Sequence, residues 1–85
     1  MTMIAGGWQA ADPASEAVQD AAKYALTQIP AGHGALAKVR IAQMQVVAGI
    51  NFRMVLQLSD GTIFEAMVWR KLDGSYALTG MPPKP

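Results

Sequence analysis

The chain of 85 residues has the length of one domain, and its composition, 52% hydrophobic and 15% charged, indicates a globular protein rather than a disordered one. A net charge of +1 gives no basic surface for nucleic acid or an anionic membrane, and no apolar run approaches the roughly 18 residues of a membrane-spanning helix. The absence of cysteine excludes disulfides, thiolate metal ligands and a cysteine nucleophile.

The first residues, MTMIAGGW, lack the basic start and the long apolar stretch of a secretory signal peptide. We therefore expect a cytoplasmic protein by default, a location that also suits a chain without cysteine. A secreted or periplasmic location stays open for the case that a signal was removed before residue 1.

The N-terminal third of the chain predicts a trunk followed by one helix. Residues 1–8 are small and glycine-rich, and are expected to form an exposed trunk with a short strand near Trp8. A helix is predicted over 13–29, with Asp12 as its N-cap and Pro30 just after its end. Its apolar face is mostly alanine, which lets a sheet approach closely. That face consists of Ala14, Val18, Ala21, Ala22, Ala25, Leu26 and Ile29.

Alternating apolar residues predict an antiparallel meander of about four strands over 36–80. In its first strand the apolar positions change phase, which predicts a β-bulge near Ala42 and Gln43. The inward side chains of the next strand are predicted to be Ile50, Phe52, Met54, Leu56 and Leu58.

Two later turns close the meander, one at Asp60-Gly61 and one at 72–74, Leu-Asp-Gly. The prolines of the tail cannot join a ladder, because they lack amide donors. The pattern therefore predicts an α+β fold in one domain over 1–85, with the helix packed across the sheet.

No group of side chains has the spacing of a catalytic or metal site. His33 lies between two glycines in a loop, where a solvated side chain is expected rather than a general base or a ligand. The six carboxylates are scattered over a helix, two turns and a strand. Phe64 and Trp69 are predicted to belong to the core. The sequence thus predicts neither an enzyme nor a metal or cofactor site.

The turn between the first two long strands is unusually apolar, because Val46, Val47 and Ala48 stand where a hairpin tip normally meets water. Taken alone, the valines can also be ordinary strand residues covered by a neighbour. Residues 45–49, Gln-Val-Val-Ala-Gly, match the Q-x-V-x-G hairpin motif of the cystatins, which are reversible protein inhibitors of papain-like cysteine proteases.

The resemblance covers nearly the whole chain. Residues 3–7, MIAGG, resemble the N-terminal trunk of the stefins, the cystatins without disulfides or signal peptides, and 78–80, LTG, resemble their last strand. Residues 65–69, EAMVW, resemble the corresponding strand of plant cystatins. The resemblance implies a cystatin-like fold, with one long helix packed across a curved antiparallel sheet of four to five strands.

The second hairpin departs from the family pattern. Many cystatins carry a Pro-Trp pair where this chain has Leu72 and Asp73, and stefins carry Leu-Pro. Leu72 can still serve as an apolar contact, whereas Asp73 places a charge where the family has an apolar residue. The departure puts in doubt how much this hairpin contributes and which proteases are bound.

The resemblance also implies a mechanism, in which the trunk and two hairpin tips form a wedge that blocks the active-site groove of the protease. Ile4 and Ala5 would occupy substrate-like subsites, and Gly6 would let the trunk pass close to the enzyme. Inhibition would be competitive and reversible. The implied protease-binding residues are Ile4, Ala5, Gly6, Gly7, Gln45, Val46, Val47, Ala48, Gly49, Leu72 and Asp73.

The oligomeric state and two other functions complete the expectations. Val47 is β-branched and lies at a bend, where backbone strain is often stored, which predicts that domain-swapped dimers form beside the monomer. A protein-interaction module with a partner other than a protease stays open. So does a small-ligand-binding domain on the same architecture, although the inward positions offer no polar group for a ligand.

Overall fold

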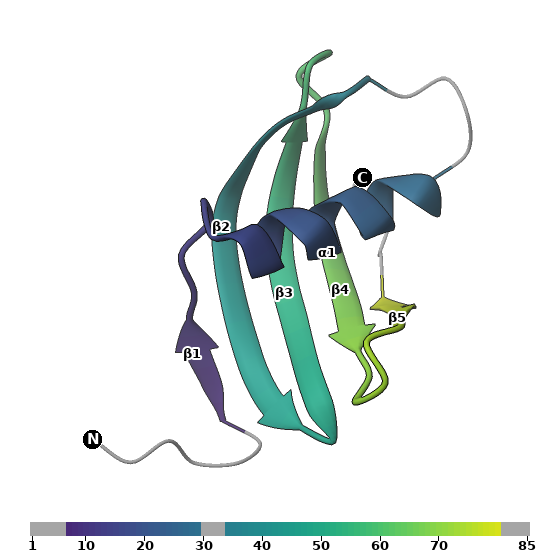
Figure 1. The fold of residues 1–85 in the computed structure, drawn as a ribbon. Coiled ribbons are helices and arrows are strands. Elements are labelled where there is room, and N and C mark those ends of the chain that lie inside the picture. Colours follow the sequence, from purple (N-terminus) through teal and green to yellow (C-terminus); the bar gives the residue numbers. More distant parts are fainter. Residues whose placement is uncertain (1–6, 30–33, 81–85) are drawn as a thin grey trace.

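The computed structural model describes residues 7–29 and 34–80. Within these residues the chain forms one helix and five strands, and the strands make one antiparallel sheet in the order β1-β2-β3-β4-β5 (Figure 1). The predicted α+β fold, with one helix packed on an antiparallel sheet, is confirmed. The elements are β1 (Trp8–Ala10), α1 (Glu16–Thr27), β2 (Leu36–Val47), β3 (Gly49–Leu58), β4 (Ile63–Arg70) and β5 (Tyr76–Gly80).

Some predicted features lie outside the described residues. They are the trunk residues Ile4, Ala5 and Gly6, the helix-ending Pro30, and His33.

The helix begins later than predicted. Ser15, not Asp12, is the N-cap, and its Oγ accepts a hydrogen bond from the Val18 amide at 3.4 Å. Asp12 instead accepts from the Ala14 amide at 2.9 Å, which closes a turn just before the helix. A carboxylate that bonds two residues ahead favours a turn over a helical first turn, and this explains the shift. A helix of the length and hydropathy needed to span a membrane is absent from the described residues.

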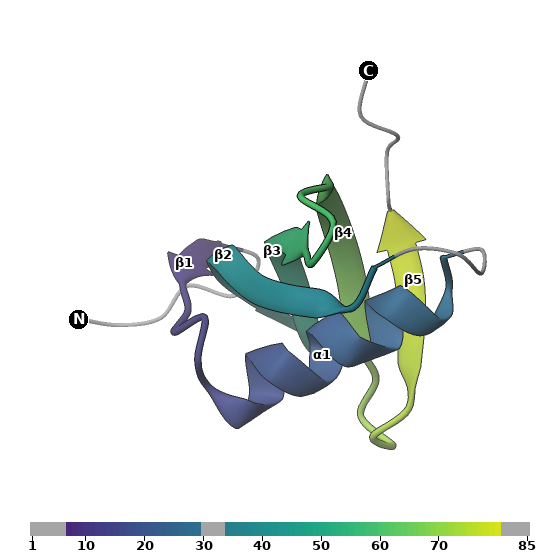
Figure 2. The ribbon, with the colours of Figure 1, turned by 90° about the horizontal axis from the view of Figure 1, so that it is seen from above.

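The core lies between α1 and the sheet, where Figure 2 shows the helix along one face with β1 and β5 at the two edges. The helix contributes Val18, Ala21, Ala22 and Ala25, all buried, whereas the predicted Ala14 is exposed. Small side chains bring the helix axis close to the sheet, and larger side chains fill the volume from the other side. These are Phe52, Met54 and Leu56 of β3 and Val68 of β4, none more than 1% exposed.

The first long strand is irregular, but not where predicted. The register of β2 against β3 shifts between Leu36 and Lys38 and again between Val39 and Ile41, so the bulges do not lie at Ala42 and Gln43. The second shift turns Ile41 outward, where it is 57% exposed, and turns Ala42 into the core. Because alanine carries a weak hydrophobic signal, the sequence pattern places the phase change later along the strand than the structure does.

Candidate functional site

The β2–β3 and β4–β5 hairpins turn at the same end of the sheet (Figure 1), and their turns are called here the first tip and the second tip. The β2–β3 hairpin closes with Val47 opposite Gly49, and the β4–β5 hairpin closes just beyond Arg70. Because Ile50 pairs with Arg70 across β3 and β4, the two tips are neighbours. The register thus brings the predicted residues 45–49 and 72–73 together.

The N-terminal strand enters at this end as well. Trp8, the first residue of β1, pairs with Gln45 close to the β2–β3 tip. The predicted site residue Gly7 precedes it directly. On the face of the sheet away from α1, the guanidinium of Arg53 stacks over the Trp8 ring, 4.7 Å from its centroid. This cation–π contact ties the start of β1 to the middle of the sheet.

The first tip exposes apolar side chains to water. Val47 is 40% exposed and Ala48 is also exposed, whereas Val46 and Gly49 are half-buried. Gly49 has a φ of +103°, and a Cβ there would collide with the carbonyl oxygen of Arg70. Only glycine therefore fits this position, because it alone tolerates both the conformation and the contact.

Backbone strain at Val47 was expected, and this expectation is wrong. Among the described residues no side-chain-bearing residue has a positive φ, and Val47 is the last residue of β2. The unusual conformation of the hairpin belongs to Gly49, for which it carries little cost.

Gln45 braces the hairpin from the side away from the helix. Its Oε1 accepts a hydrogen bond from Asn51 Nδ2 at 2.9 Å, between two residues that face each other across β2 and β3. Such a cross-strand pair fixes the hairpin two residues below its tip.

Trp69 is a site residue that sequence reasoning missed. The prediction that it belongs to the core is wrong, because it is half-buried and its Nε1 donates a hydrogen bond to the Ala48 carbonyl at 2.9 Å. The other aromatic residue assigned to the core, Phe64, is also only half-buried. Apolar residues occupy both phases of β4, so alternation gave no signal for the direction of Trp69.

The second tip presents one apolar side chain on a compact turn. Leu72 is 83% exposed, and Gly74 closes the turn with a φ of +87°. Asp73 does not point its charge at a neighbour outside the turn. Its Oδ1 accepts from the Ser75 hydroxyl at 2.6 Å and from the Ser75 amide at 2.9 Å. These bonds lower the pKa of Asp73 from its ordinary value of 3.8.

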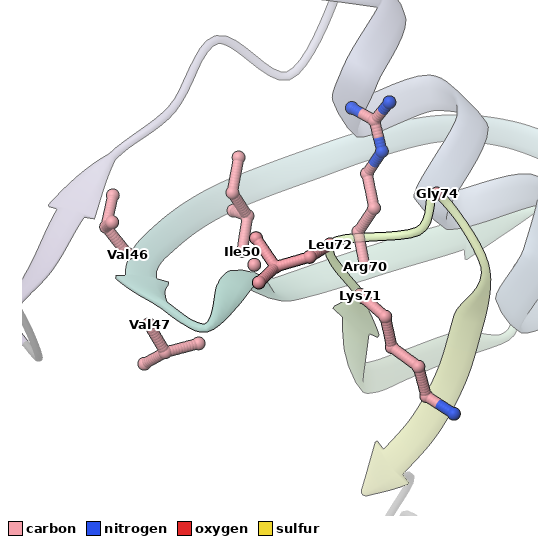
Figure 3. Close-up of a pocket in the computed structure, with 8 residues that line it drawn as sticks. Val46, Val47, Ile50, Arg70, Lys71, Leu72 and Gly74 are labelled. Carbon is pink, nitrogen blue, oxygen red and sulfur yellow. The ribbon is translucent and has the colours of Figure 1, made fainter.

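An open depression of about 300 Å³ lies between the two tips (Figure 3). Val46, Val47, Ile50 and Leu72 give it apolar walls, and Figure 3 shows Leu72 directed toward Ile50. Arg70 and Lys71 also line it, and their charged ends extend in opposite directions (Figure 3). Within 7–29 and 34–80, no three His, Asp or Glu side chains gather closely enough to hold a metal ion. The chemistry of this end is therefore apolar contact beside two cations.

Comparison with known proteins agrees with this geometry. The family model described as "Cystatin domain" matches residues 6–79. The chain is 35% identical over 80 residues to cysteine proteinase inhibitor 1 of Actinidia chinensis var. chinensis. This match covers 81% of the chain and 66% of the relative, so the chain spans just under two thirds of the relative's length. No solved structure matches the chain. Since the family model spans the helix and nearly all of the sheet that places the two tips, the chain belongs to the cystatin family.

Proposed function

We propose that the chain is a reversible, competitive inhibitor of papain-like cysteine proteases and not an enzyme. The observation that carries the proposal is the pair of exposed apolar side chains, Val47 at 40% and Leu72 at 83%, on two neighbouring tips beside one depression. Clustered apolar groups that a small protein leaves in water mark a surface that is buried in a complex. The name of the plant relative, a cysteine proteinase inhibitor, supports the same class of partner.

In the proposed complex the two tips enter the active-site groove and the N-terminal trunk follows it. Val46 to Gly49 fill the groove beside the catalytic cysteine, and Leu72 and Asp73 contact the rim next to it. Ile4 and Ala5 occupy substrate-like subsites, and Gly6 and Gly7 pass the enzyme without side chains in the way. Such an interface buries on the order of 1,600 Å².

The inhibitor blocks access without being cut. No peptide bond is presented to the nucleophile, so binding is competitive and the free inhibitor is recovered on dissociation. Affinity then depends on how little the tips must be ordered on binding, since every side chain and loop that is immobilised costs entropy. A tip fixed by hydrogen bonds before it meets the enzyme suits this requirement.

Titration of papain and of a panel of cathepsins with the protein tests the proposal. Val47→Asp is expected to raise Ki at least about tenfold, because a charge would be buried without a partner in the groove. Deletion of Gly6 should also weaken inhibition, and both variants should keep the circular dichroism spectrum of the parent. Inhibition that neither change affects would show that the tip and the trunk are not the binding surface, and a parent protein that inhibits none of these proteases would point instead to an interaction module for a different protein.

A small-ligand function is not favoured by any contact in the core. Among the described residues no polar or charged side chain is buried, and the layer between α1 and β3 is filled by Phe52, Met54 and Leu56. A ligand site needs a few convergent polar groups within a pocket, and no polar residue of the described part of the chain lies buried in this layer.

The protein is further proposed to be a monomer that forms a minor domain-swapped dimer. Ala48 is the one residue between β2 and β3, and opening of the hairpin there would let two chains exchange β1, α1 and β2. Exchange of an identical element between two chains is a low-cost route from monomer to dimer. The exchange would straighten the tip, so dimers isolated by size exclusion after heating should not inhibit papain. Dimers that inhibit as well as monomers would rule out a hinge at Ala48.

A further inference from the structure

We propose that Trp69 is a positioning residue, whose indole N–H holds the carbonyl of Ala48 and so fixes the first tip beside the second before a protease binds. The inference deepens the proposed function and rests on it. Trp69 does not line the depression between the tips, and its indole is bonded to the first tip, so in this proposal it acts through that tip.

The hydrogen bond joins parts of the chain that are far apart in sequence. Trp69 Nε1 lies 2.9 Å from Ala48 O, and 21 residues separate donor from acceptor. Ala48 stands between β2 and β3, outside both strands. Its peptide is the apex of the hairpin, and a donor that holds this carbonyl limits the swing of the whole tip. Trp69 belongs to β4, which leads directly into the second hairpin.

The backbone on either side of this bond is also in close contact. A Cβ at Gly49 would lie 3.0 Å from Trp69 Nε1 and would collide with the carbonyl oxygen of Arg70. The tip of the β2–β3 hairpin thus lies directly against the end of β4. Glycine at 49 provides the room, and the indole provides the hydrogen bond.

Trp69 lies in the middle of the sheet, between a strand on each side. Trp69 pairs with Asn51 on β3, whose side chain bonds Gln45, and with Ala77 on β5. Lys71 Nζ lies over the indole ring, 5.5 Å from its centroid. The row of Gln45, Asn51 and Trp69 therefore crosses three strands on the face away from α1. It holds the first hairpin with two hydrogen bonds, one below the tip and one at its apex.

Two substitutions at position 69 separate the donor from the bulk of the ring. Trp69→Phe keeps an aromatic ring and removes the N–H, and benzothienylalanine keeps the two-ring shape with sulfur in place of the N–H. Both are expected to raise Ki for papain about threefold to tenfold, the range for loss of one hydrogen bond. The control, Met67→Leu, changes a side chain on the same face of β4 and should leave Ki unchanged.

A readout without protease tests the same bond in the free protein. In ¹⁵N relaxation measurements the two position-69 variants should lower the order parameters of 47–49 and leave those of 63–67 unchanged. The indole proton of the parent should exchange with solvent more slowly than that of Trp8. If the parent inhibits no papain-like protease, the proposed function fails, yet these measurements still decide whether Trp69 holds the tip.

A double-mutant cycle shows through which tip Trp69 acts. Removing the indole donor should matter less once Val47 is truncated, so Trp69→Phe and Val47→Ala should be non-additive in Ki. Trp69→Phe and Leu72→Ala should combine additively. The inference is overturned if benzothienylalanine inhibits like the parent, if the order parameters of the tip do not change, or if the coupling lies with Leu72 instead.

Discussion

Gly49 decides the shape of the first tip at the scale of one residue. It combines a φ of +103° with a backbone so close to Arg70 that any side chain would meet the carbonyl oxygen. Val47 and Ala48 can therefore extend into water while the chain reverses within one residue. The last position of the Gln-Val-Val-Ala-Gly motif thus has a steric reason that is independent of any protease.

Gly49→Ala should lower the free energy of unfolding and weaken inhibition together. Gly61 offers a matched control, since its φ is +87° and a Cβ there would meet nothing within 4 Å. Gly61→Ala should cost about 1 kcal/mol for the conformation alone, and Gly49→Ala should cost more because of the collision. Urea denaturation of both variants checks this. Equal losses would show that the contact with Arg70 does not constrain the tip.

The hydrogen bonds of Asp73 predict that the stability of the second tip depends on pH in the acid range. Its pKa is lowered by hydrogen bonds from Ser75, so the ionised form is favoured in the folded protein. The stabilisation is present above the ordinary value of 3.8 and is lost as pH falls through the lowered pKa. A ¹³C titration of the carboxyl should therefore have its midpoint below 3.8, and Ser75→Ala should raise it. A midpoint that Ser75→Ala leaves unmoved would contradict these bonds.

At the scale of elements, the close contact of α1 with the sheet depends on alanine. Ala22 is fully buried, whereas Ala17 is exposed on the same helix. Ala22→Leu should destabilise the fold by about 1–3 kcal/mol, because the helix must move away from the sheet. Ala17→Leu makes the same change without that contact and should be nearly neutral. A thermal unfolding midpoint equal in the two variants would mean that the helix packs less closely than described.

Some elements could be predicted from the sequence in full, and others only in part. The strand from Gly49 to Leu58 was predictable, because its alternation runs without interruption through Phe52, Met54 and Leu56. The bulges of β2 were misplaced, since Ile41 is apolar but exposed and Ala42 is small but buried. The helix starts later than predicted because Asp12 makes a local hydrogen bond, and the pattern of hydrophobic residues contains no signal for such a bond.

The exposed apolar tips of the candidate site could be predicted from the sequence, whereas the hydrogen bonds that hold them could not. The apolar first tip and Leu72 can be recognised in the sequence, because apolar residues are unusual in a turn that is exposed to water. The bond from Trp69 to Ala48 joins positions that come together only through the register of three strands. Asp73 reads as an outward charge, whereas Ser75 holds it within its own turn.

At the scale of the whole molecule, the fold places two apolar tips side by side. The helix and sheet bury the core at the centre, and the register carries both tips to one end, next to the start of β1. Ile41 offers an internal reference, because it is 57% exposed on β2 and does not line the depression between the tips. A partner that binds the tips should therefore cover Val47 and Leu72 and leave Ile41 exposed to water.

Methyl NMR with a soluble paramagnetic agent tests the central claim directly, by reporting which side chains lose contact with water when papain is added. The methyl groups of Val47, Leu72 and Ile41 should all be relaxed by the agent in the free protein, since all three are exposed. With saturating papain, protection of Val47 and Leu72 but not of Ile41 is the predicted result. Val47 and Leu72 methyl groups that stay as accessible as before would contradict the account.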